Sequence, residues 1–133
     1  AGSAITGVAR YDGSGPDAAG TVMHAQFTLG GETFMAFDSA GQHDFGFGEA
    51  VSLAVLCDDQ AEIDRLWAAL SAVPEAEACG WIKDRYGVSW QITPTGADEM
   101  LGGPDRARAD RAMAAYLTMK KPDIAALEAA CAD

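Results

Sequence analysis

The sequence of 133 residues holds few of the residues from which metal and disulfide centres are built. Its two histidines, His24 and His43, do not lie at helical ligand spacing, and its three cysteines form no CxxC pair. Because no HxH, HExxH or paired-cysteine motif is present, we expect no protein-only metal site and no cofactor. Cys57, Cys79 and Cys131 are predicted to be reduced, packed thiols.

Basic residues are also scarce, since 9 lysines and arginines stand against 20 aspartates and glutamates, for a formal net charge of -11. A surface of this sign repels phosphate and anionic lipid, so we expect neither nucleic acid nor a membrane as partner. No apolar run approaches the roughly 20 residues of a membrane span, and the start of the sequence does not resemble a signal peptide. The sequence therefore predicts a cytoplasmic protein.

Five of the basic residues crowd into one stretch, and two interpretations stay open for them. We favour a solvated helix face with a cationic last turn, and the alternative is a basic stripe. The residues are Arg106, Arg108, Arg111, Lys120 and Lys121.

Motifs for nucleotide and nucleophile chemistry are missing as well. No GxSxG elbow is present, and no GxGxxG fingerprint follows a strand. The glycine-rich segment 41–48 lacks the spacing and the lysine of a phosphate loop, so it is predicted to be a surface connection. These absences argue against nucleotide cofactors and against the common serine hydrolases.

What the sequence does contain is a globular pattern, with 49% hydrophobic and 22% charged residues, in a length that suits one domain. Strands are expected over residues 4–11, 21–29, 33–38, 50–57, 79–83 and 88–93. Helices are expected from Asp59 to just before Pro74, over 105–121 and over 123–131. This order predicts an α+β fold with a largely antiparallel sheet.

Two local signals support these elements. Asp59 as N-cap places Glu62 at the third helical position, which is an acidic variant of the capping box. Gly30 and Gly31 offer the positive φ angles of a two-residue hairpin turn. Near the carboxyl end, an apolar set is predicted to pack on the domain or on a second subunit: Met113, Tyr116, Leu117, Ile124 and Leu127.

The last predicted strand has two different faces. Val88, Trp90 and Ile92 alternate with Ser89, Gln91 and Thr93. A strand face of small, polar, uncharged side chains is typical of a ligand cavity, whereas nearby aromatic residues can fill either a core or a cavity.

Several stretches resemble the PhnB-like family, labelled 3-demethylubiquinone-9 3-methyltransferase, of the glyoxalase, bleomycin-resistance and extradiol-dioxygenase (vicinal oxygen chelate) superfamily. They are FMA at 34–36, AVSL at 50–53, CGWIKDRYGVSWQI at 79–92 and MKKPDIA at 119–125. The resemblance implies paired βαβββ modules whose strands form a curved sheet around a cavity, usually within a homodimer. It divides a single domain, 1–133, into a partial first module (1–49), a second module (50–94) and C-terminal helices (95–133). The first module would lack a strand and a helix at its N-terminal side.

The resemblance also indicates where a metal would lie. Metal-dependent members of the superfamily carry histidine or glutamate on the cavity strands, at positions that correspond to Ala36, Ser52 and Gln91. Alanine has no ligand atom, and neutral serine and glutamine oxygens are poor ligands for zinc, nickel or iron. The sequence thus departs from the metalloenzyme pattern.

We therefore expect a cavity that binds a small, partly aromatic or polar metabolite, with no assigned catalytic residue. Its lining is predicted to consist of some of the following residues: His24, Gln26, Phe34, Asp38, Ser52, Ser89 and Gln91. One alternative is an enzyme, either a metal-free or atypical-metal lyase or isomerase, with His24 or Asp38 as general base, or the methyltransferase of the family label. Another is a structural dimer with a vestigial cavity.

Overall fold

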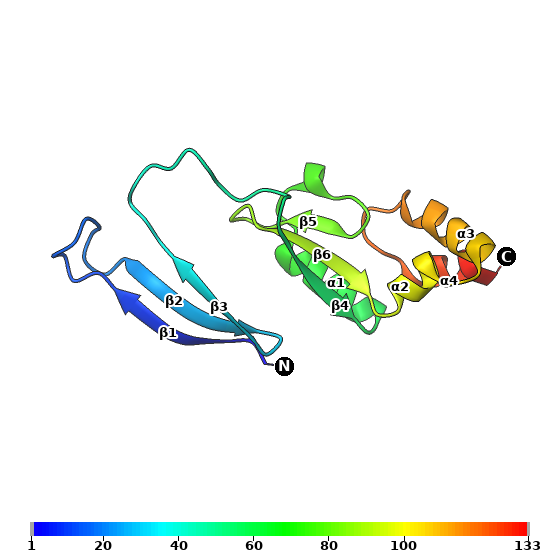
Figure 1. Ribbon diagram of the computed structural model, residues 1–133, viewed down its shortest axis with the longest axis horizontal. Coiled ribbons are helices and arrows are strands. Elements are labelled where there is room, and N and C mark those ends of the chain that lie inside the picture. Colours follow the sequence, from blue (N-terminus) through cyan, green and yellow to red (C-terminus); the bar gives the residue numbers. More distant parts are fainter. Residues whose placement is uncertain (1, 133) are drawn as a thin grey trace. The chain divides into compact units, whose positions relative to one another are not determined.

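The computed structural model describes residues 2–132 and separates into two compact units, Ala1–Phe45 (unit 1) and Gly46–Asp133 (unit 2). In the described part of the chain, each unit holds one three-stranded sheet, and unit 2 adds four α-helices (Figure 1). The predicted α+β class is confirmed. None of the helices among residues 2–132 has the length and apolar character needed to cross a membrane.

Unit 1 is an antiparallel sheet in which neighbouring strands follow one another along the chain. Its strands are β1 (Ala4–Arg10), β2 (Val22–Leu29) and β3 (Glu32–Phe37), in the order β1-β2-β3. The turn between β2 and β3 uses positive φ angles of 58° at Gly30 and 97° at Gly31, as predicted. The three strands lie within about two residues of the predicted ranges, because alternation and turn residues mark them locally.

Unit 2 begins with a strand, a helix and two further strands. These are β4 (Ser52–Cys57), α1 (Gln60–Leu70), a short 3-10 helix η1 (Pro74–Ala76), β5 (Trp81–Lys83) and β6 (Ser89–Pro94). The sheet order is β4-β6-β5, with β4 parallel and β5 antiparallel to the central strand β6. Residues 50–94 thus form βαββ, one strand fewer than the implied module, because Gly96 at φ 83° leads the chain into another helix.

The junction between β4 and α1 follows the predicted capping chemistry. The Asp59 carboxylate accepts a hydrogen bond from the Glu62 backbone N–H at 2.8 Å. The Glu62 side chain in turn accepts from the backbone N–H of Asp58, one residue before the N-cap, at 3.4 Å. α1 ends at Leu70, and Pro74 opens η1.

The core of unit 2 lies between α1 and one face of the sheet. Cys57, Ile63, Ile82 and Ile92 are fully buried there. Partly buried side chains pack around them: Val55, Leu66, Trp67, Leu70, Trp90 and Ile124. Figure 1 shows α1 against the sheet, which leaves the opposite face of β4, β6 and β5 without helical cover from α1.

Three helices complete unit 2: α2 (Ala97–Gly102), α3 (Arg106–Tyr116) and α4 (Ile124–Ala132). α2 was not predicted, and α3 ends at Tyr116 rather than continuing to residue 121. It ends there because the Met119 and Lys120 carbonyls accept hydrogen bonds from the Cys79 and Gly80 backbone N–H groups, each at 2.9 Å. A tertiary contact therefore stops the helix.

The predicted apolar stripe of α3 is only partly buried. Ala109 and Ala112 are the buried residues of this helix, whereas the Met113 and Leu117 side chains remain 38% and 64% exposed. Small side chains allow α3 to approach α4 closely, and Leu127 of α4 is fully buried. α3 therefore packs through its alanines rather than through Met113 and Leu117, whereas α4 contributes Leu127 and Ile124.

The basic residues near α3 do not form one continuous helix face. Lys120 and Lys121 lie beyond the end of α3. Their ammonium groups lie 3.6 Å from a Glu77 oxygen and 2.6 Å from an Asp64 oxygen, respectively. The stretch is therefore divided between a helix and a segment that forms ion pairs with acidic residues.

Candidate functional site

The face of the unit 2 sheet turned away from α1, which we term the open face, carries the candidate site. Side chains alternate along a strand, so the neighbours of the core residues Ile82, Ile92 and Cys57 point to this face. Its members are Ser52, Ala54, Leu56, Trp81, Lys83, Ser89, Gln91 and Thr93. The predicted polar face of β6 is therefore found opposite the core.

Two of these residues contact each other directly. The Gln91 side-chain N–H donates to the Ser52 hydroxyl oxygen at 2.8 Å, between the parallel strands β6 and β4. Both occupy positions at which the resemblance implies metal ligands, but here they form a neutral hydrogen-bonded pair, which does not fit a transition metal. Among residues 2–132, no three histidine, cysteine, aspartate or glutamate side chains gather closely enough to hold a metal ion.

Beside the edge strand β5, the open face borders an open pocket of about 430 Å³. Its walls come from the loop before β4, from η1 and the turn after it, and from β5 and β6. The lining residues are Glu49, Ala76, Ala78, Cys79, Trp81, Ile82, Lys83 and Ser89. This volume lies within the range of roughly 300–1,000 Å³ that is usual for small-molecule sites, and the mostly apolar lining with few polar groups is also typical of them.

Ser89 is the unusual residue of this lining. The residue is 2% exposed, and its hydroxyl oxygen is buried without a hydrogen-bond partner among the described residues. An unsatisfied buried hydroxyl costs about 1–3 kcal/mol of stability, so native proteins rarely keep one without a reason. The pocket lining therefore includes a residue whose buried hydroxyl the described residues leave unpaired.

Lys83 places a positive charge on the same wall. Its ammonium forms an ion pair with the Glu49 carboxylate, and the side chains are 25% and 64% exposed, respectively. The hydrogen bond from Lys83 lowers the pKa of the Glu49 carboxyl below its ordinary value. Because the carboxylate is largely in solvent, the pair adds little to stability.

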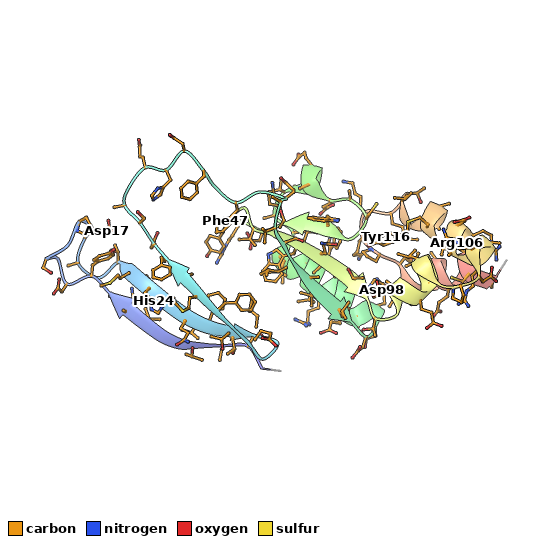
Figure 2. All side chains as sticks on the ribbon, viewed as in Figure 1. Asp17, His24, Phe47, Asp98, Arg106 and Tyr116 are labelled. Carbon is orange, nitrogen blue, oxygen red and sulfur yellow. The ribbon has the colours of Figure 1, made fainter. Side chains whose placement is uncertain are left out.

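Cys79 lies at one end of the pocket in a strained turn. It has φ 48°, and its thiol donates to the Leu117 carbonyl at a sulfur–oxygen distance of 3.8 Å. Tyr116, the last residue of α3, is labelled in Figure 2, and its hydroxyl donates to the Cys79 carbonyl at 2.6 Å. By contrast, burial raises the pKa of the Cys57 thiol to about 11, as expected for a thiol inside the core.

The structure brings three of the seven predicted cavity residues together. Ser52, Ser89 and Gln91 share the open face of unit 2. The other four, His24, Gln26, Phe34 and Asp38, belong to unit 1, and His24 is labelled there in Figure 2.

Within unit 1 the four residues do not share one face. His24 lies opposite Phe37 in the hairpin register, with ring centroids 5.1 Å apart, and Gln26 shares this face. Phe34 lies opposite Phe27 and stacks on it at 5.8 Å, on the other face. The register of the hairpin therefore places Phe34 on the face opposite His24 and Gln26.

Asp38 lies just beyond the end of β3, where its carboxylate accepts from the Ser39 backbone N–H at 3.0 Å. It is exposed. Of the two proposed general bases, His24 is thus a strand residue that lies beside the Phe37 ring. Asp38 is a loop residue.

Sequence reasoning missed two polar residues of the pocket, Lys83 and Glu49. The alternation along 81–83 could have placed Lys83 on the open face, once Ile82 was assigned to the core. No sequence signal joins it to Glu49, which lies far away along the chain.

Comparison with known proteins agrees with the fold and the strand motifs. The family model described as 3-demethylubiquinone-9 3-methyltransferase matches residues 1–93. No curated protein matches the chain. Among solved structures, a putative 3-demethylubiquinone-9 3-methyltransferase, PhnB protein, from Bacillus cereus is 42% identical, with a TM-score of 0.60, and the match covers 69% of this chain and 79% of that one.

Two further solved structures are similar in sequence. A Pseudomonas aeruginosa protein is 28% identical over 62% of this chain and 71% of that one, with a TM-score of 0.45. A Staphylococcus aureus protein is 31% identical over 67% of this chain and 71% of that one, with a TM-score of 0.24. The family model and the Bacillus cereus relative together show that the chain belongs to the PhnB-like, 3-demethylubiquinone-9 3-methyltransferase family.

Proposed function

We propose that the chain is a small-molecule-binding protein whose ligand occupies the pocket between β5 and the loop before β4. The observation that carries this proposal is the buried, unpartnered hydroxyl of Ser89, a residue of the pocket lining. A ligand that hydrogen-bonds this hydroxyl recovers the free energy that the unliganded fold gives up there. Trp81 supplies a flat apolar wall, as many ligand sites do.

A substitution of the hydroxyl tests the proposal in two readouts at once. Ser89→Ala removes a polar atom that makes no hydrogen bond, so the free energy of unfolding without ligand should stay unchanged or rise by about 1 kcal/mol. Ligand binding should weaken at the same time. A residue whose removal helps folding and harms binding serves the ligand rather than the fold.

The matched control is Ser52→Ala, which removes the hydroxyl that accepts from Gln91. This variant should lose about 0.5–1.5 kcal/mol of stability in urea denaturation. Ligands for the comparison come from a metabolite library screened by NMR, with the backbone amides of β5 and β6 as reporters. If Ser89→Ala is destabilised as much as Ser52→Ala and binds every hit normally, the proposal is wrong.

A second candidate function is methyl transfer, which is favoured by the family name and by the name of the Bacillus cereus relative. Within the pocket lining, Glu49 is the carboxylate that could take the proton of a phenolic acceptor. Its lowered pKa and its pairing with Lys83 make it a weak base, which is why we favour binding. Incubation with a sulfonium methyl donor and a catechol, read by mass spectrometry, would support methyl transfer if product forms and disappears in Glu49→Gln.

A further inference from the structure

We infer that the ligand of this pocket is a planar aromatic carboxylate. The inference rests on the proposed binding function and adds the chemical class of the ligand. It follows from the way β5 and β6 place one flat side chain and two hydrogen-bond donors on the same wall.

The register of β5 and β6 sets this arrangement. Lys83 lies directly opposite Ser89, and Trp81 lies directly opposite Gln91, all on the open face. Directly opposed side chains have Cβ atoms about 4.5–5.5 Å apart, so the Lys83 ammonium and the Ser89 hydroxyl can reach one acceptor group. Trp81 is two residues from Lys83 on the same strand face, which places an aromatic wall beside the two donors.

The ion pair of Lys83 with Glu49 occupies only one of the two donors. The Glu49 carboxylate binds the ammonium, but the Ser89 hydroxyl has no partner. A ligand carboxylate that displaces Glu49 and reaches the buried Ser89 hydroxyl can accept from both groups. Because Glu49 is 64% exposed and Lys83 only 25%, the glutamate can swing into solvent while the ammonium stays at the wall.

Charge decides against the other ligand classes. A cationic ligand would meet the Lys83 ammonium, and Glu49, the one acidic side chain of the lining, is already paired with it. A dianionic phosphate would find a single cation in a chain of net charge -11. A monoanion with an apolar body matches one ammonium, one hydroxyl and a lining of alanine, isoleucine and tryptophan.

The test compares 2-naphthoate with its neutral amide, 2-naphthamide, and with the cationic 2-naphthylmethylamine, on the full chain by NMR titration. We expect naphthoate to bind about tenfold tighter than the amide, because a hydrogen bond to a charged group is stronger than a neutral one. Lys83→Met should bring naphthoate down to the affinity of the amide. Glu49→Gln should raise naphthoate affinity several-fold, since it removes the competing carboxylate.

Lys121→Met is the matched control, because it deletes a cation that pairs with Asp64 away from the pocket lining. It should leave all three affinities unchanged. The inference is overturned if amide and carboxylate bind equally and Lys83→Met changes neither, or if the amine binds best. If Ser89→Ala still weakens the binding of a compound, the proposed function stands although the inference about ligand class fails. If no library compound shifts the backbone amide signals of β5 and β6, both the inference and the proposed function are wrong.

Discussion

The turn at Gly80 offers the sharpest test of the structure, because a single methyl group cannot be accommodated there. Gly80 has φ 82°, a conformation that side-chain-bearing residues rarely adopt. A Cβ atom at this position would lie 2.6 Å from the Tyr116 hydroxyl oxygen and 2.7 Å from the Ile92 carbonyl oxygen. Ile92 belongs to the central strand β6, so its carbonyl cannot move aside without disturbing the sheet.

Two costs add in the variant Gly80→Ala. A left-handed backbone with a side chain costs about 1–3 kcal/mol, and forced overpacking typically costs about 1–3 kcal/mol more. The smaller entropy of the unfolded alanine chain returns about 0.4–1 kcal/mol. We therefore expect a net loss of about 1–6 kcal/mol, a substantial part of the roughly 5–15 kcal/mol that holds a domain folded.

Urea denaturation followed by tryptophan fluorescence measures this loss. The matched control is Gly96→Ala, at φ 83°, where a Cβ would meet no atom within 4 Å. Gly96→Ala carries the backbone cost alone, so Gly80→Ala should lie below it by the overpacking cost. Adding Tyr116→Phe to Gly80→Ala should not restore stability, because the Ile92 carbonyl remains. Equal losses in the two glycine variants would refute the close contact.

Two further predictions concern unit 2. Glu77→Ala should cost about 1.5–3 kcal/mol in urea denaturation, because the carboxylate accepts from the Ser71 hydroxyl at 2.6 Å. That hydrogen bond lowers the pKa of Glu77, so its contribution is present above the ordinary glutamate pKa and is lost as pH falls through the lowered one. In Glu77→Gln the free energy of unfolding should fall less steeply as the pH is lowered. An unchanged pH dependence would contradict the assignment to Glu77. Second, a disulfide reagent at mildly alkaline pH should modify Cys79 and spare Cys57, whose pKa is raised to about 11 by burial; mass spectrometry of native protein that shows Cys57 labelled first would contradict this.

The elements that could be predicted from sequence are those specified by neighbouring residues. The Asp59 cap and the Gly30-Gly31 turn each act within a few positions, and both appear as predicted. The end of α3 could not be predicted, because it depends on hydrogen bonds from Cys79 and Gly80, which are distant in sequence. Local propensity therefore gives the start of a helix more readily than an end that the tertiary structure imposes.

In the candidate site, too, the residues placed by a local pattern could be predicted, whereas those placed by the three-dimensional fold could not. Alternation along β6 placed Ser89 and Gln91 on one face, since strand periodicity needs no knowledge of the partner strand. Which face carries Phe34 depends on the hairpin register, and alternation within one strand does not reveal that register. The pairing of Lys83 with Glu49 needs the full three-dimensional fold of unit 2.

The strand order of unit 2 has a consequence for how the nascent chain acquires its structure. The central strand β6 is the last of the three to be synthesised, and β4 and β5 each pair with it rather than with each other. Until β6 has emerged from the ribosome, neither β4 nor β5 has its partner strand in this sheet. The sheet therefore cannot begin to form before β6 has emerged, and until then α1 is the element available to shield the apolar side of β4.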